Sequence, residues 1–187
     1  MKSNLFKMPK AVTINGRSSS LTNAFVNGII PCIEPTHEEI EYALEILGQN
    51  DGNIVCVYCG DRATEWDHLN PLILKQKPTG YISEIKNLVP ACGKCNQSKG
   101  NKYWKEWIRS KAVLSPFQRN VANLEEKIRT IERYQEIFIP VIIDFEKIVD
   151  HDLWSEHWMN HKSLLEILKN MQVLSNKIKE QIRKNIM

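Results

Sequence analysis

The chain has 187 residues, of which 42% are hydrophobic, and a net charge of +3. This length suits one ordinary domain, or a small catalytic core with helical additions, and makes a second full-sized domain unexpected. The sequence has no apolar run long enough for a membrane helix and no apolar stretch behind its N-terminal lysines, so neither a membrane span nor a secretory signal is expected. A weakly basic charge by itself also suits many enzymes that never bind nucleic acid.

Residues 1–53 are predicted to form an N-terminal arm followed by a short helix. The first thirty residues show no sustained hydrophobic periodicity, which is typical of an arm. Thr36 and Glu39 then make a capping-box pattern, and apolar residues follow at helical spacing up to Leu47. Gly48 is expected to end this helix.

Residues 54–111 are predicted to hold the functional core. The β-rich run over residues 54–58 and the segment 63–67 are expected to form two short strands. A turn is expected at residues 77–80, where Pro and Gly occur together. A short helix is predicted over residues 93–98, just before Gly100.

Residues 112–187 are predicted to be helical. Apolar residues at intervals of three, four or seven between Val121 and Phe138 indicate one helix, which Pro140 ends. One or two short helices and a long amphipathic helix from Leu164 to Ile182 are expected to follow. We interpret this region as a helical bundle or hairpin, whose apolar stripes are either core or a homodimer seam.

Four of the five cysteines form two Cys-x-x-Cys pairs, made by Cys56, Cys59, Cys92 and Cys95. Each pair can turn a tight knuckle and direct both sulfurs at one ion, so the four thiols predict a closed, structural zinc site. Such spacing suits a reducing compartment better than a disulfide framework, and we expect the protein to be cytoplasmic. Cys32 is left over and is expected to be a small buried residue.

Basic residues gather just after the second cysteine pair. A single acid interrupts this run, and Tyr103, Trp104 and Trp107 are interleaved with it. The tryptophans are as easily explained by inward packing as by ligand contact, whereas the cations favour contact with phosphates. The expected DNA-binding residues are Lys94, Lys99, Lys102, Lys105 and Arg109.

The two cysteine pairs enclose further motifs in a fixed order. These are Cys56-Val-Tyr-Cys59, then Glu65-Trp-Asp67-His68-Leu-Asn-Pro71, then Asn87-Leu-Val-Pro-Ala-Cys92-Gly-Lys-Cys95-Asn96-Gln-Ser-Lys99-Gly100. Together they resemble an HNH endonuclease over about 45 residues. The resemblance implies an α+β fold with a ββα-metal core, in which two antiparallel strands and a helix surround one divalent cation.

Hydrolysis of a phosphodiester needs an activated water and stabilisation of negative charge on the phosphate and on the departing oxygen. His68 has a free pKa near neutrality and is the predicted general base. Asp67 is a hard oxygen ligand for Mg²⁺ or Mn²⁺, and the resemblance places Asn96 as the second ligand. The resemblance also implies that Asn87 positions the loop and the histidine, while Lys99 is predicted to steady a phosphate.

The favoured function is therefore metal-dependent cleavage of DNA. The preferred version is site-specific cleavage of double-stranded DNA, as in type II restriction enzymes. Homing or phage-type HNH nucleases remain alternatives, as does an RNA nuclease with the same core. A non-catalytic zinc-ribbon module that binds nucleic acid is the competing class, although it leaves Asp67, His68 and Asn96 unexplained. The C-terminal helices are a candidate homodimer interface. His157 and His161 are expected to be surface or packing residues, although their spacing of four on a possible helix would also allow adventitious metal binding.

Overall fold

The computed structural model describes residues 8–50 and 52–186, so the predicted arm's first residues, including Lys2 and Lys7, lie outside the described part. The chain divides into two compact units. The central unit is Val26–Phe145, and the terminal unit combines the residues up to Phe25 with those from Glu146 onward. Among the described residues, none of the helices is both long enough and apolar enough to cross a membrane.

The central unit begins with the predicted capping-box helix. Helix α2 (His37–Ile46) starts at Thr36, whose side chain accepts a hydrogen bond from the backbone N–H of Glu39, while the Glu39 carboxylate accepts one from the backbone N–H of Thr36. Gly48 follows the helix with a φ of 68°, in the left-handed region that glycine adopts without strain. Both ends of this prediction are confirmed. Cys32, in contrast to the expectation, is exposed.

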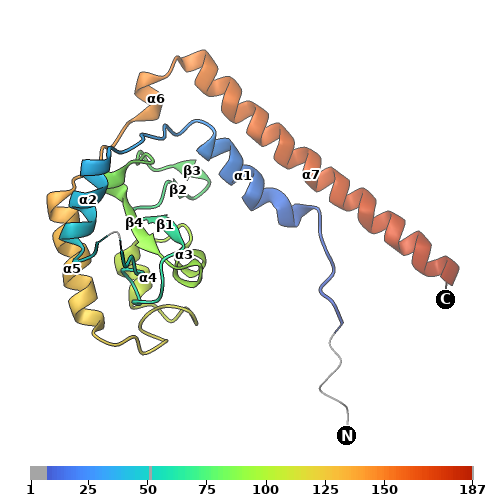
Figure 1. Cartoon of the computed structure of the whole chain (residues 1–187). Coiled ribbons are helices and arrows are strands. Elements are labelled where there is room, and N and C mark those ends of the chain that lie inside the picture. Colours follow the sequence, from blue (N-terminus) through green and yellow to red (C-terminus); the bar gives the residue numbers. More distant parts are fainter. Residues whose placement is uncertain (1–7, 51, 187) are drawn as a thin grey trace, which may run out of the picture. The chain divides into compact units, whose positions relative to one another are not determined.

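Two strands and one helix form the centre of this unit (Figure 1). Strand β1 (Glu65–His68) pairs antiparallel with β4 (Leu88–Ala91), and the 3-10 turn η2 (Ile85–Asn87) leads into β4. Helix α3 (Gly93–Lys99) follows directly and ends at Gly100. The predicted α+β class, with two strands and a short helix at its core, is confirmed.

The β-rich run over residues 54–58 does not form a strand, which corrects the prediction. It makes one isolated bridge, between Val55 and Arg62. The backbone of Cys56 is otherwise occupied, because its N–H donates to Asp61 O at 2.7 Å and its carbonyl accepts from Gly60 N at 2.8 Å. These bonds close the first knuckle and leave few backbone groups for a sheet.

A small hairpin fills the segment between the two strands. Strands β2 (Ile73–Leu74) and β3 (Lys77–Pro78) pair antiparallel, and the two residues that join them, Lys75 and Gln76, have φ values of 49° and 67°. Two consecutive left-handed residues make the tight hairpin turn that suits the twist of the strands. The chain therefore reverses at residues 75–76 rather than at 77–80, without the Asn-Gly pattern that normally marks such a turn.

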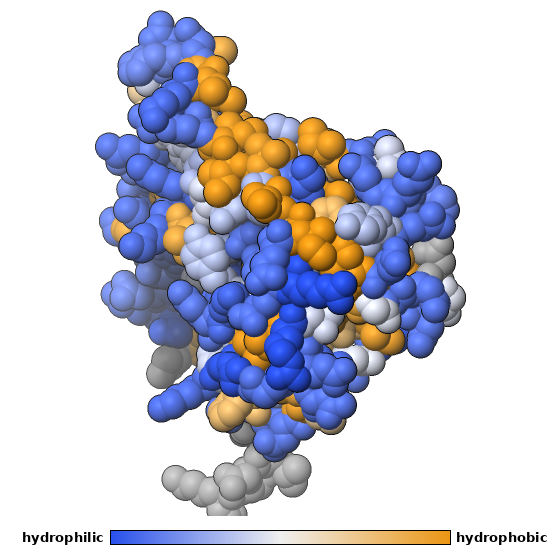
Figure 2. All heavy atoms as spheres, turned by 90° about the vertical axis from the view of Figure 1, so that its left-hand side faces the viewer, coloured by the Kyte–Doolittle hydropathy of each residue, from blue (hydrophilic) through white to orange (hydrophobic). Residues whose placement is uncertain are grey.

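The hydrophobic core of the central unit lies between the strands and three helices. Helix α4 (Trp104–Ile108) buries both of its tryptophans, so these aromatic residues pack inward. Helix α5 (Leu124–Ile137) contributes Ile128, Ile131 and Tyr134 to the same core as α2. On the side that carries α2 and α5, hydrophobic residues also gather on the surface (Figure 2), and exposed ones near the end of α5 include Ile137, Ile139 and Ile142.

The terminal unit is built on one long helix, α7 (His151–Ile186), preceded by the short helix α6 (Phe145–Ile148). The predicted C-terminal region, residues 112–187, is thus divided between the two units, because α5 packs in the central unit and α7 belongs to the terminal one. Near the N-terminus, η1 (Asn15–Arg17) and α1 (Ser18–Asn27) replace part of the expected arm. Two of the three histidines of α7 contact α1, with His161 Nε2 2.9 Å from Thr22 Oγ1 and His157 Nε2 3.1 Å from Phe25 O.

Candidate active site

The two cysteine pairs meet as a single cluster. Cys56 and Cys59 lie on the first knuckle, and Cys92 and Cys95 lie at the start of α3. The four sulfur atoms are within 4.8 Å of one another, and Cys59 Sγ is 3.6 Å from Cys92 Sγ. Zinc with Zn–S bonds of about 2.3 Å holds its sulfurs about 3.8 Å apart in a tetrahedron, so these thiols fit a zinc ion. All four positions would be filled by protein, which is the pattern of a structural site.

The crowding of the thiols perturbs their protonation. Hydrogen bonding to Cys59 and burial raise the pKa of Cys56 to about 12, while hydrogen bonds from neighbouring thiols lower the pKa of Cys59. The guanidinium of Arg119 donates to Cys95 Sγ at 3.3 Å and to Asp61 at 3.0 Å. A cluster of thiols with an adjacent cation is suited to holding negative charge, as four zinc-bound thiolates would require.

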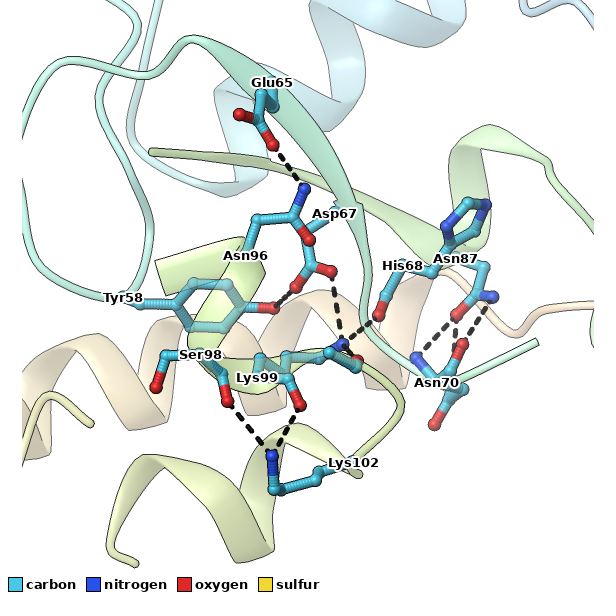
Figure 3. A network of polar contacts seen from close by, with 11 residues as sticks. Tyr58, Glu65, Asp67, His68, Asn70, Asn87, Asn96, Ser98, Lys99 and Lys102 are labelled. Carbon is cyan, nitrogen blue, oxygen red and sulfur yellow. Dashed lines mark hydrogen bonds and ion pairs between the residues drawn. The ribbon is translucent and has the colours of Figure 1, made fainter. Parts of the chain in front are cut away.

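Asp67 is a buried polar residue near this cluster. It lies on β1 and is only 4% exposed. The Tyr58 hydroxyl donates to its Oδ2 at 2.6 Å, and the Lys99 ammonium donates to its Oδ1 at 3.2 Å (Figure 3). Lys99 also donates to the backbone carbonyl of His68 at 2.6 Å. Both carboxylate oxygens of Asp67 therefore have a fixed partner.

Burial affects the protonation of all three side chains in this network. It raises the pKa of Asp67 and lowers the pKa of Lys99, because each charge is removed from water, while their mutual attraction opposes both shifts. Burial also raises the pKa of Tyr58 well above its usual value, with a further contribution from Asp67. Tyr58 is therefore protonated near pH 7 and donates its hydroxyl hydrogen to Asp67.

Asn96 lies beside Asp67, on the first turns of α3 (Figure 3). Its side-chain nitrogen donates to Glu65 Oε2 at 2.5 Å, which assigns the amide oxygen as the atom available to a cation. Glu65 and Asp67 share one face of β1, since alternate residues of a strand point to the same side. A Cβ atom at Gly93 would lie 2.9 Å from Glu65 Oε1, so glycine leaves room for this carboxylate over the start of α3.

His68 follows Asp67 on β1, and its side chain projects in a different direction from that of Asp67. Its imidazole points away from the Asp67 carboxylate (Figure 3), and its Nε2 lies 2.8 Å from Ser83 Oγ. Ser83 is held by the segment before α2, because its carbonyl accepts from Ile33 N at 2.8 Å and its N–H donates to Pro31 O at 3.1 Å. Burial and the nearby Lys99 lower the pKa of His68 to about 4, so the ring is neutral near pH 7.

Asn87 fixes the loop that follows His68. Its Oδ1 accepts from the backbone N–H of Asn70 at 2.9 Å and from the Asn70 side chain at 3.2 Å, and its Nδ2 donates to Asn70 O at 3.1 Å. The backbone carbonyl of Asn87 also accepts from Leu69 N at 2.8 Å. Asn87 is fully buried, and these bonds are the contacts that a positioning role requires.

The predicted DNA-binding cations fall into two groups. Four of them are exposed, namely Lys94, Lys102, Lys105 and Arg109. Among these, Lys105 pairs with Glu132 and Arg109 with Glu125, both on α5, and exposed pairs of this kind contribute little to stability. Lys99 differs, because its side chain is 1% exposed and its ammonium faces Asp67 rather than solvent.

Three residues that contact the site were given no role in the sequence prediction. Glu65 lies two residues before Asp67, so strand periodicity alone would have placed both carboxylates on one face. Tyr58 lies between two predicted zinc ligands, but nothing in its position indicates that its hydroxyl reaches Asp67. Ser83 carries no sequence signal, because it meets His68 only through the folded path of the chain.

Comparison with known proteins agrees with this arrangement. Residues 56–102 match the family model of the HNH endonuclease, which confirms the resemblance seen in the motifs. The chain is similar to the CRISPR-associated endonuclease Cas9 of Corynebacterium diphtheriae, with 35% identity over 65 residues. That match covers 33% of this chain and only 6% of the relative. No solved structure matches the chain significantly.

Proposed function

We propose that this chain, whose residues 56–102 form an HNH endonuclease domain, is a divalent-metal-dependent endonuclease that hydrolyses phosphodiester bonds of DNA. The observation that carries the proposal is that the Asn96 side chain, held by Glu65, lies beside the Asp67 carboxylate, which Tyr58 and Lys99 hold in place (Figure 3). A carboxylate and an amide oxygen leave most of an octahedral shell for water and phosphate, which suits Mg²⁺ or Mn²⁺.

Each step of the hydrolysis has a candidate residue. A bound Mg²⁺ or Mn²⁺ would polarise the phosphate and neutralise charge on the departing oxygen. Asp67 and Asn96 would hold this ion through their side-chain oxygens. His68 would take a proton from the attacking water at a ring nitrogen, and a pKa of about 4 leaves the ring neutral and able to accept it. Asn87 would keep the loop after His68 in place.

Nucleic-acid binding is assigned to the basic residues around α3 and α4. We propose that Lys94, Lys102, Lys105 and Arg109 contact phosphates, since weak exposed pairs can be exchanged for phosphate contacts. Lys99 would reach a phosphate only by changing its present contacts with Asp67 and His68 O. The four cysteines would hold a structural zinc ion.

We also propose a domain organisation around the nuclease core. We assign the nuclease core to residues 54–111, with an N-terminal segment over 1–53 and a helical region over 112–187. We favour site-specific cleavage of double-stranded DNA, as in type II restriction enzymes, because substantial segments flank the domain on both sides; a homing or phage-type nuclease is the alternative. A homodimer through the C-terminal helices and a cytoplasmic location complete the proposal.

The test is cleavage of defined plasmid DNA by the wild type and by His68→Ala, with and without Mg²⁺ or Mn²⁺. Removal of the general base should lower the cleavage rate by about 10²- to 10⁴-fold, while the zinc content and DNA affinity stay unchanged. Gel analysis and end sequencing would separate discrete fragments, made by a site-specific enzyme, from a smear. Unchanged cleavage by His68→Ala would contradict the assigned role.

The same assay separates the competing functions. A zinc-ribbon binding module would retain DNA affinity without cleavage under any metal condition. An RNA nuclease would cleave an RNA of the same sequence in preference to the DNA, and substitution of 2′-deoxynucleotides would reduce that cleavage.

A further inference from the structure

The two oxygens of Asp67 accept hydrogen bonds from side chains on the two segments that carry the cysteine pairs. Oδ2 accepts from Tyr58, which lies between Cys56 and Cys59 on the first knuckle. Oδ1 accepts from Lys99, on the helix that begins at the second knuckle. The first knuckle and helix α3, which carry the two cysteine pairs, thus each contribute one side chain to the same carboxylate, which is the candidate ligand for the catalytic ion.

Tyr58 is rigidly held. Its side chain is fully buried, and the Trp107 ring packs against it edge-on with the ring centroids 5.1 Å apart. The backbone on either side is fixed as well, because Val57 N–H donates to Pro90 O on β4 at 3.0 Å and Gly60 N–H donates to Cys56 O at 2.8 Å. The hydroxyl therefore meets Asp67 at a position set by the knuckle and the core.

Lys99 lies on α3, the helix that begins at the second knuckle and carries Cys95. Cys95 and Lys99 are four residues apart on α3, so both project from one side of the helix. The Lys99 ammonium also bonds to His68 O, which anchors the end of β1. A shift of α3 would consequently move Cys95, Asn96 and Lys99 together.

Tyr134 shows that a buried tyrosine hydroxyl in this core can find hydrogen-bond acceptors without a carboxylate. Its hydroxyl donates to two backbone carbonyls, Ile85 O at 2.7 Å and Leu88 O at 2.9 Å. Tyr58 instead donates to a single charged acceptor. Hydrogen bonds to ionised groups are stronger than neutral ones and fix the orientation of the acceptor.

We propose that Tyr58 is a positioning residue, which orients the Asp67 carboxylate for the divalent cation and, with Lys99, links that carboxylate to both zinc knuckles. This inference rests on the proposed function of the same site as a metal-dependent nuclease. Groups that hydrogen-bond to a metal ligand fix its orientation, and their loss commonly lowers metal affinity or activity by about 10- to 100-fold.

The experiment compares Tyr58→Phe with Tyr134→Phe in the full chain loaded with zinc. Each variant removes one buried hydroxyl from the same core, but only Tyr58→Phe removes a bond to Asp67. Mn²⁺ affinity is measured from the EPR signal of the free ion, together with zinc content and the thermal midpoint. Tyr58→Phe should bind Mn²⁺ about 10-fold or more weakly while keeping its zinc, and Tyr134→Phe should bind Mn²⁺ as the wild type does.

Wild-type Mn²⁺ affinity in Tyr58→Phe would overturn the inference, as would an equal loss in both variants. If Tyr58→Phe does not fold, NMR of the wild type with ¹³C-labelled tyrosine decides. Addition of Mg²⁺ should then shift the Tyr58 resonance and not that of Tyr134, and an unmoved Tyr58 resonance would overturn the proposal.

Plasmid cleavage by the wild type, run in parallel, separates this inference from the proposed function. A weaker Mn²⁺ site in Tyr58→Phe without wild-type cleavage supports the positioning role and rejects the nuclease. Wild-type cleavage with unchanged Mn²⁺ affinity in Tyr58→Phe retains the nuclease and rejects the positioning role.

Discussion

The HNH domain at residues 56–102 and helix α7 differ in what stabilises their backbones. The longest element of the domain is the seven-residue α3, and its polar side chains Asp67, Asn87 and Lys99 are buried with hydrogen-bond partners. Helix α7 runs for 36 residues, and among its described residues only His161 is buried. Short elements need links between distant parts of the chain, whereas a long helix makes its hydrogen bonds within itself.

Helix α5 sharpens the contrast, because its apolar pattern resembles that of α7. In α5 the stripe is covered, and Ile131 and Tyr134 are fully buried. In α7 the corresponding residues, such as Leu174 and Ile178, are about half exposed in this single chain, with values of 59% and 48%. Periodicity thus indicates an amphipathic helix, but it does not indicate what covers the apolar face.

Removal of zinc should have the largest effect on stability, and it should destabilise residues 56–102 while leaving α7 nearly unchanged. Zinc binding contributes about 10–16 kcal/mol to folding in small zinc domains, which is comparable with the whole stability of an ordinary protein. We expect amides in residues 56–102 to lose protection from hydrogen exchange when a strong chelator removes the zinc. Amides of α7 should change little, because this helix makes its contacts with Thr22 and Phe25 in its own unit.

The control for zinc removal is Cys32→Ser, since Cys32 is exposed and outside the cluster. This variant should bind zinc and exchange amides as the wild type does. Protection in residues 56–102 that survives complete zinc loss would contradict the structural role of the ion.

Breaking the buried ion pair between Asp67 and Lys99 should cause the next largest loss of stability. Asp67→Asn leaves the Lys99 charge buried without a counter-ion, and breaking a buried pair in this way costs about 3–5 kcal/mol. The double variant Asp67→Asn with Lys99→Met removes both charges and should recover much of that loss. Denaturant unfolding of the two single variants and the double variant measures the coupling.

A double variant as unstable as the sum of its single variants would show that the two charges do not interact. Glu125→Gln is a suitable control, because it breaks an exposed pair with Arg109 and should leave stability nearly unchanged.

Substitution of one apolar residue on each of the helices α5 and α7 should give the smallest effects on stability and the most direct comparison. Ile131→Ala in α5 removes a buried side chain and should cost about 2–5 kcal/mol. Leu174→Lys in α7 should change the stability of the single chain by no more than about 0.5 kcal/mol. If α7 forms the proposed homodimer, the same variant should sediment as a monomer at concentrations where the wild type does not. A wild type that stays monomeric with and without DNA would rule out that interface.

Local signals account for what the sequence predicted correctly. The capping box at Thr36 and Glu39 depends on residues three positions apart, and it forms as expected. The cysteine cluster was also predictable, because thiol spacing and zinc chemistry restrict each pair to a knuckle. The end of α3 at Gly100 follows from the freedom of glycine at a φ of 51°.

The remaining features depend on partners that are distant in the sequence. The inward orientation of Lys99 is set by Asp67, 32 positions away along the chain. Helix α1 has little apolar periodicity, and its contacts with α7 come from residues more than 130 positions away. The hairpin turn at Lys75 and Gln76 uses left-handed conformations at residues that seldom adopt them. None of these features is visible in a short window of sequence.

Helix α3 carries candidate ligands for two different ions, the structural zinc and the catalytic cation. This restricts which insertions and deletions its sequence can tolerate. Cys95 faces the other cysteines of the cluster, while its neighbour Asn96 faces Asp67. One inserted or deleted residue before Cys95 would rotate the rest of the helix by about 100° and remove both side chains from their sites. We therefore expect homologous chains to vary in length in the hairpin segment between the strands, and to keep the distance from Cys92 to Lys99 constant.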